Sequence, residues 1–175
     1  PVEAEFVNAD LFEAAQLQQV RDPQKRSAQA REWADHRRAQ CLREGKTFVS
    51  ETVFSHPSKL DLISAAQAAS FNVVLLVVCV DDPTQLLSRV RQRELEGGHG
   101  VPAERILARY PRTLAHLSQA VLLADLALLY DTSRPRNRVV QPPRLVARCR
   151  SGQIVWREPS APPEWLARVL DAAQA

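Results

Sequence analysis

Polar side chains follow two short apolar segments in the first third of the chain. The first segment ends in Asn8 and Asp10, and the second ends in Glu51 and Thr52, with Ser55 shortly after. A carboxylate at such a position can hold an incoming group and accept its proton, and the neighbouring amide and hydroxyl groups can hydrogen-bond to a ligand. These residues are the first candidates for a binding site.

The same residues also have structural interpretations. Asp is a favoured N-cap, and the local pattern alone favours Asp10 as the cap of a helix that begins at Leu11. A lone Glu at a strand end is usually solvated. Ser50, Thr52 and Ser55 crowd around Glu51, however, and this density of polar groups is more typical of a pocket wall.

Arginine dominates the basic residues. Of the 23 Lys and Arg residues only Lys25, Lys46 and Lys59 are lysines. The planar guanidinium group binds phosphate through two parallel hydrogen bonds. Because 20 Asp and Glu residues are interspersed with the basic ones, the formal net charge is only +3, which argues against a duplex-binding protein. A phosphorylated small molecule is the better match.

Five arginines lie on two consecutive segments with helical spacing. Arg89 and Arg93 are about one helical turn apart, and the next segment carries Arg105, Arg109 and Arg112 on one face. The break between them, Gly97-Gly98-His99, is expected to act as a lid that brings guanidinium groups to phosphate oxygens and excludes water. The alternative is a solvated surface on which nearby glutamates pair with the arginines.

The sequence excludes several other classes of protein. The longest apolar run, 73–80, is far shorter than the ~20 residues that cross a bilayer. The three cysteines, Cys41, Cys79 and Cys149, are widely spaced, which argues against a disulfide framework and a zinc site and indicates the cytoplasm. No G-x-S-x-G motif of a serine hydrolase is present, and no His and carboxylate have metal-ligand spacing on one helix.

Strands and helices are expected to alternate along the chain. Asp22, Pro23 and Gly45 are capping signals for one long helix. This alternation predicts right-handed βαβ units and a three-layer, mostly parallel α/β sheet, with its longest apolar strand buried on both faces and its ligands at the carboxyl ends of strands. The expected strands are 5–8, 46–52, 71–80 and 126–130, followed by a hairpin of 144–150 and 153–157 and a last helix over 162–173.

An ordered set of segments resembles one family. The segments are Phe6–Asp10, Phe48–Thr52, Ser55–Lys59, Arg89 to Arg93, Gly97–His99, Val101-Pro102, Ile106, Arg109–Arg112, Ala124-Asp125 and Tyr130–Ser133. Together they resemble the zeta-toxin-like P-loop kinases, in the bacterial chromosomal branch of that family, over about residues 6–133. Each segment alone is a weak signal, and their order makes the combination specific.

The resemblance implies a P-loop NTPase kinase fold, ATP and Mg²⁺ as cofactors, and phosphoryl transfer to an alcohol group. Toxin members of the family phosphorylate a hydroxyl of UDP-N-acetylglucosamine, and a protein antitoxin is an implied partner. The expected organisation is a kinase-like core over residues 1–140, followed by a C-terminal hairpin and helix over 141–175.

The resemblance also assigns roles to residues. Asp10 is the expected base for the acceptor hydroxyl, Arg93 and Arg109 are expected to neutralise phosphate charge, and Asp81 is a candidate for holding Mg²⁺ through water. The toxin members carry an Arg near the position of Ser55, which leaves the identity of the acceptor open. The expected acceptor ligands are Asn8, Glu51, Thr52 and Ser55, and the expected nucleotide ligands are Arg89, His99, Arg112, Thr132 and Ser133.

The chain departs from the family pattern at one motif. The family has a first strand and a G-x-x-x-x-G-K-[ST] loop before the Asn-x-Asp segment, and the five glycines here, at 45, 97, 98, 100 and 152, do not have that spacing. We expect that one βα unit of about 30 residues is missing in front. Without the loop, this chain is not expected to transfer phosphate. The alternative is a non-catalytic relative that binds a nucleotide sugar or a protein antitoxin.

Overall fold

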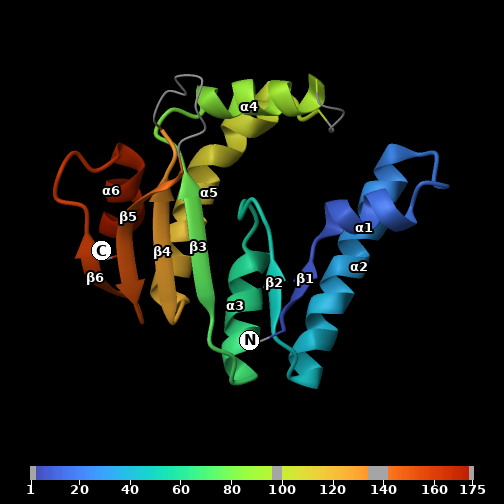
Figure 1. Cartoon of the computed structure of the whole chain (residues 1–175), viewed down its shortest axis with the longest axis horizontal. Coiled ribbons are helices and arrows are strands. Elements are labelled where there is room, and N and C mark those ends of the chain that lie inside the picture. Colours follow the sequence, from blue (N-terminus) through green and yellow to red (C-terminus); the bar gives the residue numbers. More distant parts are fainter. Residues whose placement is uncertain (1–2, 96–99, 134–141, 174–175) are drawn as a thin grey trace. The chain divides into compact units, whose positions relative to one another are not determined.

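The computed structural model describes residues 3–95, 100–133 and 142–173. The chain divides into two compact units, which Figure 1 draws with their helices and strands labelled. The first unit contains Pro1–Val53 and Ala68–Phe71, and the second contains Phe54–Gln67 and Asn72–Ala175. The predicted domain boundary between residues 140 and 141 lies outside the described residues.

The first unit is a small βαβ arrangement. The strands β1 and β2 are parallel neighbours, with Val7 opposite Ser50. Val7, Ala34 and Cys41 form its buried core, and the pKa of the Cys41 thiol is raised by burial. The elements of this unit are β1 (Glu5–Val7), α1 (Ala9–Gln16), α2 (Pro23–Glu44) and β2 (Phe48–Ser50).

Local sequence signals set the ends of α2. The Asp22 carboxylate accepts hydrogen bonds from the backbone N–H groups of Gln24 and Lys25, and Pro23 occupies the first turn, where no N–H is needed. Gly45 ends the helix with a φ of 66°, a left-handed conformation that glycine adopts without strain. The predicted bounds of this helix are confirmed.

The second unit contains a four-stranded mixed sheet. Its strand order is β3-β4-β5-β6, in which β3 and β4 are parallel and the two later pairs are antiparallel. The predicted hairpin, with its turn at Ser151-Gly152, is confirmed, but it continues the sheet of β3 and β4. The elements are α3 (Ser58–Ala68), β3 (Val74–Cys79), α4 (Thr84–Leu95), α5 (Ala103–Leu123), β4 (Leu126–Asp131), β5 (Arg144–Arg150), β6 (Gln153–Arg157) and α6 (Glu164–Asp171).

The α/β class is confirmed, but the predicted mostly parallel sheet is wrong. In the described residues, β1 and β2 form a separate parallel pair, and half of the strand pairings of the chain run parallel. The apolar pattern identified each strand without fixing its neighbours, because the same alternation suits a parallel and an antiparallel partner.

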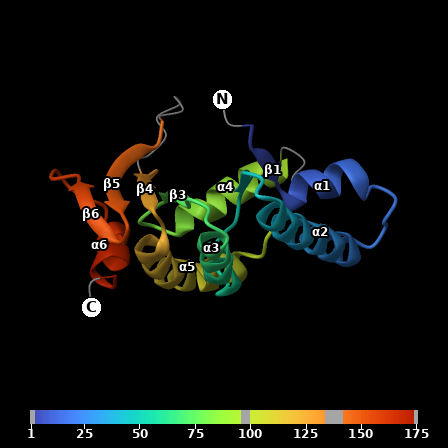
Figure 2. The same cartoon turned by 90° about the horizontal axis from the view of Figure 1, so that it is seen from below.

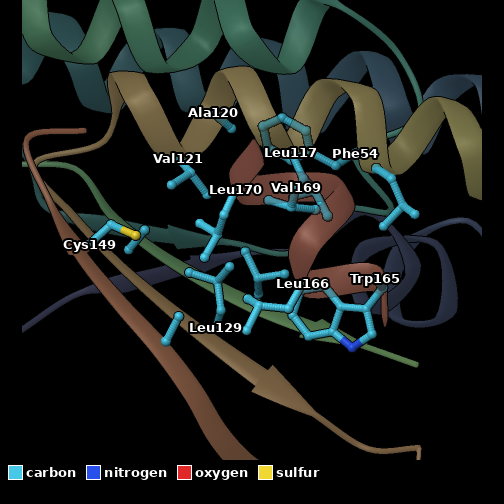
Figure 3. Close-up of a cluster of buried hydrophobic side chains, with 14 of the residues drawn as sticks. Phe54, Leu117, Ala120, Val121, Leu129, Cys149, Trp165, Leu166, Val169 and Leu170 are labelled. Carbon is cyan, nitrogen blue, oxygen red and sulfur yellow. The ribbon is translucent and has the colours of Figure 1, made fainter. Parts of the chain in front are cut away.

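The core of the second unit lies between the sheet and two helices. Figure 2 shows α5 and α6 along the same side of the four-stranded sheet. Leu129 from β4, Leu117 from α5, and Trp165 and Leu166 from α6 meet in this layer (Figure 3). Trp165, Leu129 and Leu166 are each at most 1% exposed. Because two of these residues come from α6, this helix is an integral part of the core.

One face of β3 is exposed, contrary to prediction. Val74, Leu76 and Val78 are 57%, 64% and 58% exposed, whereas Val77 between them is buried against the helices. The prediction of burial on both faces is therefore wrong in this structure. An apolar run indicates a strand that suits burial, and it does not identify what would cover the second face.

Candidate functional site

The carboxyl ends of β1 and β2 bring the first group of predicted site residues together. Because Val7 lies opposite Ser50, the next residues, Asn8 and Glu51, leave neighbouring strand ends. The Asn8 side-chain N–H (Nδ2) donates a hydrogen bond to Oε2 of Glu51 over 3.2 Å. Thr52 follows Glu51 and has an exposed side chain. We call Asn8, Asp10 and Glu51 the acceptor cluster.

Asn8 is the N-cap of α1. Its Oδ1 accepts the backbone N–H groups of Asp10 at 2.8 Å and Leu11 at 3.1 Å, and α1 begins at Ala9. The alternative in which Asp10 caps a helix beginning at Leu11 is therefore wrong. The side-chain oxygen of Asn8 accepts hydrogen bonds from the first turn of α1, and its side-chain N–H donates to Glu51. This one side chain therefore links the turn that carries Asp10 to Glu51.

The Asp10 carboxylate is available to a ligand. Asp10 is exposed, and its carboxylate has no hydrogen bond or ion pair with any residue in 3–95, 100–133 or 142–173. It lies in the first turn of α1, where the helix dipole favours a negative charge. The ionised form is the one that can accept a proton from a hydroxyl group.

Arg38 supports the acceptor cluster from α2. Its guanidinium group is buried and donates from Nη1 to Oγ of Ser50 over 3.2 Å, and from Nη2 to the Asp35 carboxylate. Ser50 directly precedes Glu51, so Arg38 fixes the end of β2. Sequence reasoning missed this residue. The available signal was the helical spacing of Ala34, Arg38 and the buried Cys41, which places an arginine on the inner face of α2.

The second unit has its own carboxylates at the ends of parallel strands. Asp131 is 4% exposed, and its Oδ1 accepts hydrogen bonds from N–H and Oγ of Ser133, at 3.1 and 2.5 Å, and from Nε1 of Trp165 at 3.2 Å. Arg144 lies 3.6 Å from its other oxygen. Asp81 accepts the backbone N–H of Trp165 at 2.8 Å. The hydrogen bonds from Trp165 to these two carboxylates hold α6 against the sheet.

The predicted nucleotide ligands of this region contact one another. Arg89 donates from Nη1 to Oγ1 of Thr132 at 3.0 Å and from Nη2 to the Thr132 carbonyl oxygen at 2.8 Å. Thr132 also donates to the carbonyl oxygen of Cys79, and Oγ of Ser133 accepts the N–H of Asp81. These bonds order the start of the segment after β4. A role in nucleotide binding for these residues stays a prediction.

Arginines gather on α5 as predicted. Arg105, Arg109 and Arg112 line one shallow hollow of about 360 Å³ together with Glu104 and Ala108. Their predicted common face is confirmed. On α4, Arg93 is exposed. The expected lid residues Gly97, Gly98 and His99 lie outside the described residues.

The predicted site residues fall in both units. Asn8, Asp10, Glu51 and Thr52 belong to the first unit. The second unit contains Ser55, Arg89, Arg93, Arg109, Arg112, Thr132 and Ser133. The meeting of Asp10 and Glu51 with Arg93 and Arg109 stays a prediction.

Two features that would hold Mg²⁺ and ATP are not found in the described part of the chain. Across 3–95, 100–133 and 142–173, no three His, Cys, Asp or Glu side chains gather as a metal site. The whole sequence has no phosphate-binding loop of the G-x-x-x-x-G-K-[ST] type. Asp81, the candidate Mg²⁺ ligand, has one carboxylate oxygen occupied by the N–H of Trp165.

The cysteines have raised thiol pKa values. Burial is the main cause for both Cys79 and Cys149, and the pKa of Cys79 rises to about 11. A thiol with this pKa is protonated at neutral pH, so Cys79 behaves as a small apolar side chain of β3.

No helix in the described part of the chain is both long enough and apolar enough to cross a membrane.

Comparison with known proteins gives no match. No protein-family model matches the chain, and no curated protein and no solved structure matches it either. The assignment of function therefore depends on the residues and geometry of the two units.

Proposed function

We propose that the protein is a small-molecule kinase of the zeta-toxin type, and that this chain carries its hydroxyl-acceptor side. The observation that carries the proposal is the acceptor cluster. Asn8 caps α1 and donates to Glu51, and this arrangement leaves the Asp10 carboxylate exposed and without a partner among the described residues. A kinase needs such a carboxylate beside the incoming hydroxyl group.

Each residue of the acceptor cluster has a distinct task in this proposal. Asp10 orients the acceptor hydroxyl and receives its proton. Glu51 accepts hydrogen bonds from neighbouring hydroxyl groups of the ligand, and the N–H of Asn8 fixes one of its two carboxylate oxygens. The second oxygen of Glu51 is the one that faces a ligand. Thr52 adds a hydroxyl group beside it.

We propose that the phosphate donor binds to residues of the second unit. Arg109 lines the hollow on α5, and Arg93 lies exposed on α4. Their guanidinium groups are suited to the charge of a phosphate chain. ATP and Mg²⁺ belong to the proposal through the family resemblance alone, and we expect this chain by itself to bind an acceptor without turnover.

A second candidate function follows from the same cluster. A non-catalytic relative would bind a nucleotide sugar, or a protein antitoxin that covers this cluster, without phosphoryl transfer. The two candidates differ in the second unit, because only the kinase needs a site for the donor phosphates.

Thermal-shift measurements with nucleotide sugars test the acceptor cluster. A ligand that binds the native state raises the melting temperature. We expect at least one nucleotide sugar to stabilise the chain, Glu51→Gln to weaken that effect, and Asp10→Asn to retain it. Glu32→Gln and Asp61→Asn are matched controls on the exposed surfaces of α2 and α3. Stabilisation that is unchanged in Glu51→Gln, or absent for every nucleotide sugar, would contradict the proposal.

Inorganic triphosphate separates the two candidates. The kinase proposal expects triphosphate to stabilise the chain and Arg109→Gln to reduce that stabilisation, with Arg31→Gln on α2 as the control. Triphosphate and the nucleotide sugar should bind without competition. A nucleotide sugar that binds while triphosphate has no effect would support the non-catalytic relative.

A further inference from the structure

The charges of the chain are unevenly distributed along the sequence. The formal net charge is +3, yet residues 132–157 contain seven arginines and no Lys, Asp or Glu. This segment contributes +7, which leaves a net charge of −4 for the rest of the chain. A local excess of one sign attracts ligands of the opposite sign even when the net charge of the protein is small.

Two of these arginines project from β5 on the side away from the core. Arg148 and Arg150 alternate with the buried Ala147 and Cys149, and successive side chains of a strand point to opposite faces. Both arginines are exposed, and neither forms an ion pair or side-chain hydrogen bond with a described residue. Their guanidinium groups are therefore available to a ligand.

An aromatic side chain lies beside these arginines on β6. Trp156 pairs with Arg148 across the hairpin and Gln153 pairs with Arg150, so the four side chains share one side of the sheet. Trp156 is 41% exposed. We call Arg148, Arg150, Gln153 and Trp156 the hairpin face. The helix α6 packs on the other side of the same sheet (Figure 2).

Arg144 shows what an arginine of β5 with a structural role looks like. Its guanidinium group lies 3.6 Å from the Asp131 carboxylate and 4.0 Å from that of Glu158. Neither β5 nor β6 contains an Asp or Glu that could neutralise Arg148 and Arg150 in the same way. The charge of the hairpin face is therefore not used inside the described fold.

The hairpin face is separate from the exposed apolar face of β3 and β4. A helix is about 10 Å wide and neighbouring strands are about 4.8 Å apart, so one helix covers about two strands. An apolar helix that also covered β5 and β6 would bury the charges of Arg148 and Arg150 without partners, which costs free energy. The hairpin face is therefore suited to a polar, anionic ligand.

We infer that the hairpin face binds single-stranded nucleic acid. Arg148 and Arg150 bind backbone phosphates, and an unpaired base stacks on Trp156. Sites of this class combine cationic side chains along the backbone with an aromatic ring under a base. A duplex keeps its bases stacked inside, and an acidic peptide would leave the ring of Trp156 without a stacking partner. This inference does not depend on the proposed kinase function.

A labelled oligouridine of about ten nucleotides tests the inference, because single-strand sites extend over about 4–16 nucleotides. Its binding to the full chain is followed by fluorescence anisotropy at several salt concentrations. The variants are R148Q/R150Q, W156L and W156F. The matched control R31Q/R43Q removes two exposed arginines of α2.

The expected result is a loss confined to the hairpin-face variants. R148Q/R150Q should lose on the order of tenfold in affinity, and the slope of log K against log salt should fall by about 1.4, since each phosphate contact on a single strand contributes about 0.7. W156L should also lose on the order of tenfold, and W156F should retain most of the affinity because it keeps a stacking ring. R31Q/R43Q should bind as the unchanged protein does, and a duplex of the same length should bind more weakly.

Four results would overturn the inference. The first is no binding of oligouridine, and the second is an equal loss in R148Q/R150Q and R31Q/R43Q. The third is displacement of the oligonucleotide by excess nucleotide sugar, which would place it at the acceptor cluster. The fourth is binding of a polyglutamate peptide that R148Q/R150Q abolishes and W156L leaves unchanged, without binding of oligouridine, which would assign the hairpin face to an acidic protein.

Discussion

Carboxylates stand at the carboxyl ends of parallel strands in both units, and they differ in how their oxygen atoms are used. In the first unit, Asp10 is exposed and has no partner among the described residues. In the second unit, Asp131 is buried and accepts three hydrogen bonds, two of them from Ser133. The carboxylate that follows a parallel strand is therefore exposed and without a partner among the described residues in one unit, and is bound into the fold in the other.

Burial explains the difference. A buried carboxylate costs free energy unless donors replace the water that it loses. Asp131 obtains those donors from Ser133, from Trp165 on α6 and from Arg144 on β5. Asp10 remains in water and needs no such compensation. A carboxylate whose partners come from several elements is a structural group, and one without partners is the candidate for chemistry.

The largest predicted effect is the loss of the buried carboxylate. We expect Asp131→Ala to lower the free energy of unfolding by about 3 kcal/mol, because the Trp165 N–H, Ser133 and Arg144 all lose their acceptor. Asp10→Ala should cost less than about 1 kcal/mol, since only the interaction with the helix dipole is lost. Urea unfolding followed by circular dichroism measures both. Equal costs for the two variants would remove the contrast between the units.

The second predicted effect appears at high pH. The Tyr110 hydroxyl donates to the carbonyl oxygen of Val80 at 2.5 Å, and burial raises the pKa of Tyr110 to about 12 from 10.0. Between these two pH values the unfolded chain loses the proton first. The unfolded state therefore binds fewer protons than the native state, and stability falls as the pH rises.

Tyr110→Phe checks this pH dependence. From pH 10 to 12 the unchanged protein should lose on the order of 2 kcal/mol through this group. Cys79, with a pKa of about 11, contributes in an overlapping range, so the difference between the unchanged protein and Tyr110→Phe isolates the tyrosine. Parallel stability curves for the two proteins over this range would show that the Tyr110 hydroxyl is not held as a neutral donor.

Sequence signals predicted the local structure well where one residue type had one strong role. The N-cap Asp22, the C-cap Gly45 and the hairpin turn at Ser151-Gly152 are all in the predicted places. Near Asp10 two favoured N-caps stand two residues apart, and propensity alone does not choose between them. The structure identifies Asn8 as the N-cap. The strand β1 ends at Val7, which pairs with Ser50 of β2, and α1 begins directly after Asn8.

Contacts between residues far apart in the chain could not be predicted from the sequence, for a physical reason. The fourth strand was predicted to end at residue 130, but Asp131 is the last residue of β4, because Cys79 of β3 lies opposite it and Trp165 supplies a donor from a distant helix. Arg38 was missed for the same reason. A buried polar side chain is identified by its partners, and those partners are fixed only when the chain has folded.

Arg38 tests whether the acceptor cluster depends on support from α2. Arg38→Met keeps the aliphatic packing and removes the donor to Ser50, so it should cost about 1 kcal/mol of stability. It should also reduce the stabilisation by a nucleotide sugar, because Glu51 follows Ser50. Arg43→Met, an exposed change on the same helix, is the control. Unchanged ligand binding in Arg38→Met would confine Arg38 to a structural role.

The smallest predicted effect separates the two tasks of Asn8. Asn8→Ala removes the N-cap of α1 and should cost about 1 kcal/mol. Asn8→Asp keeps an acceptor for the N–H groups of Asp10 and Leu11, so its stability should change by less than about 0.5 kcal/mol. Asp has no N–H for Glu51, however, and its charge repels that carboxylate.

We therefore expect Asn8→Asp to retain the stability of the first unit and lose the thermal shift caused by a nucleotide sugar. Urea unfolding and thermal-shift titration on the same samples measure the two properties. If Asn8→Asp is as unstable as Asn8→Ala, the bond from Asn8 to Glu51 holds the fold as the bonds of Asp131 do. The acceptor cluster would then be a structural network, because its carboxylate would depend on internal donors in the same way.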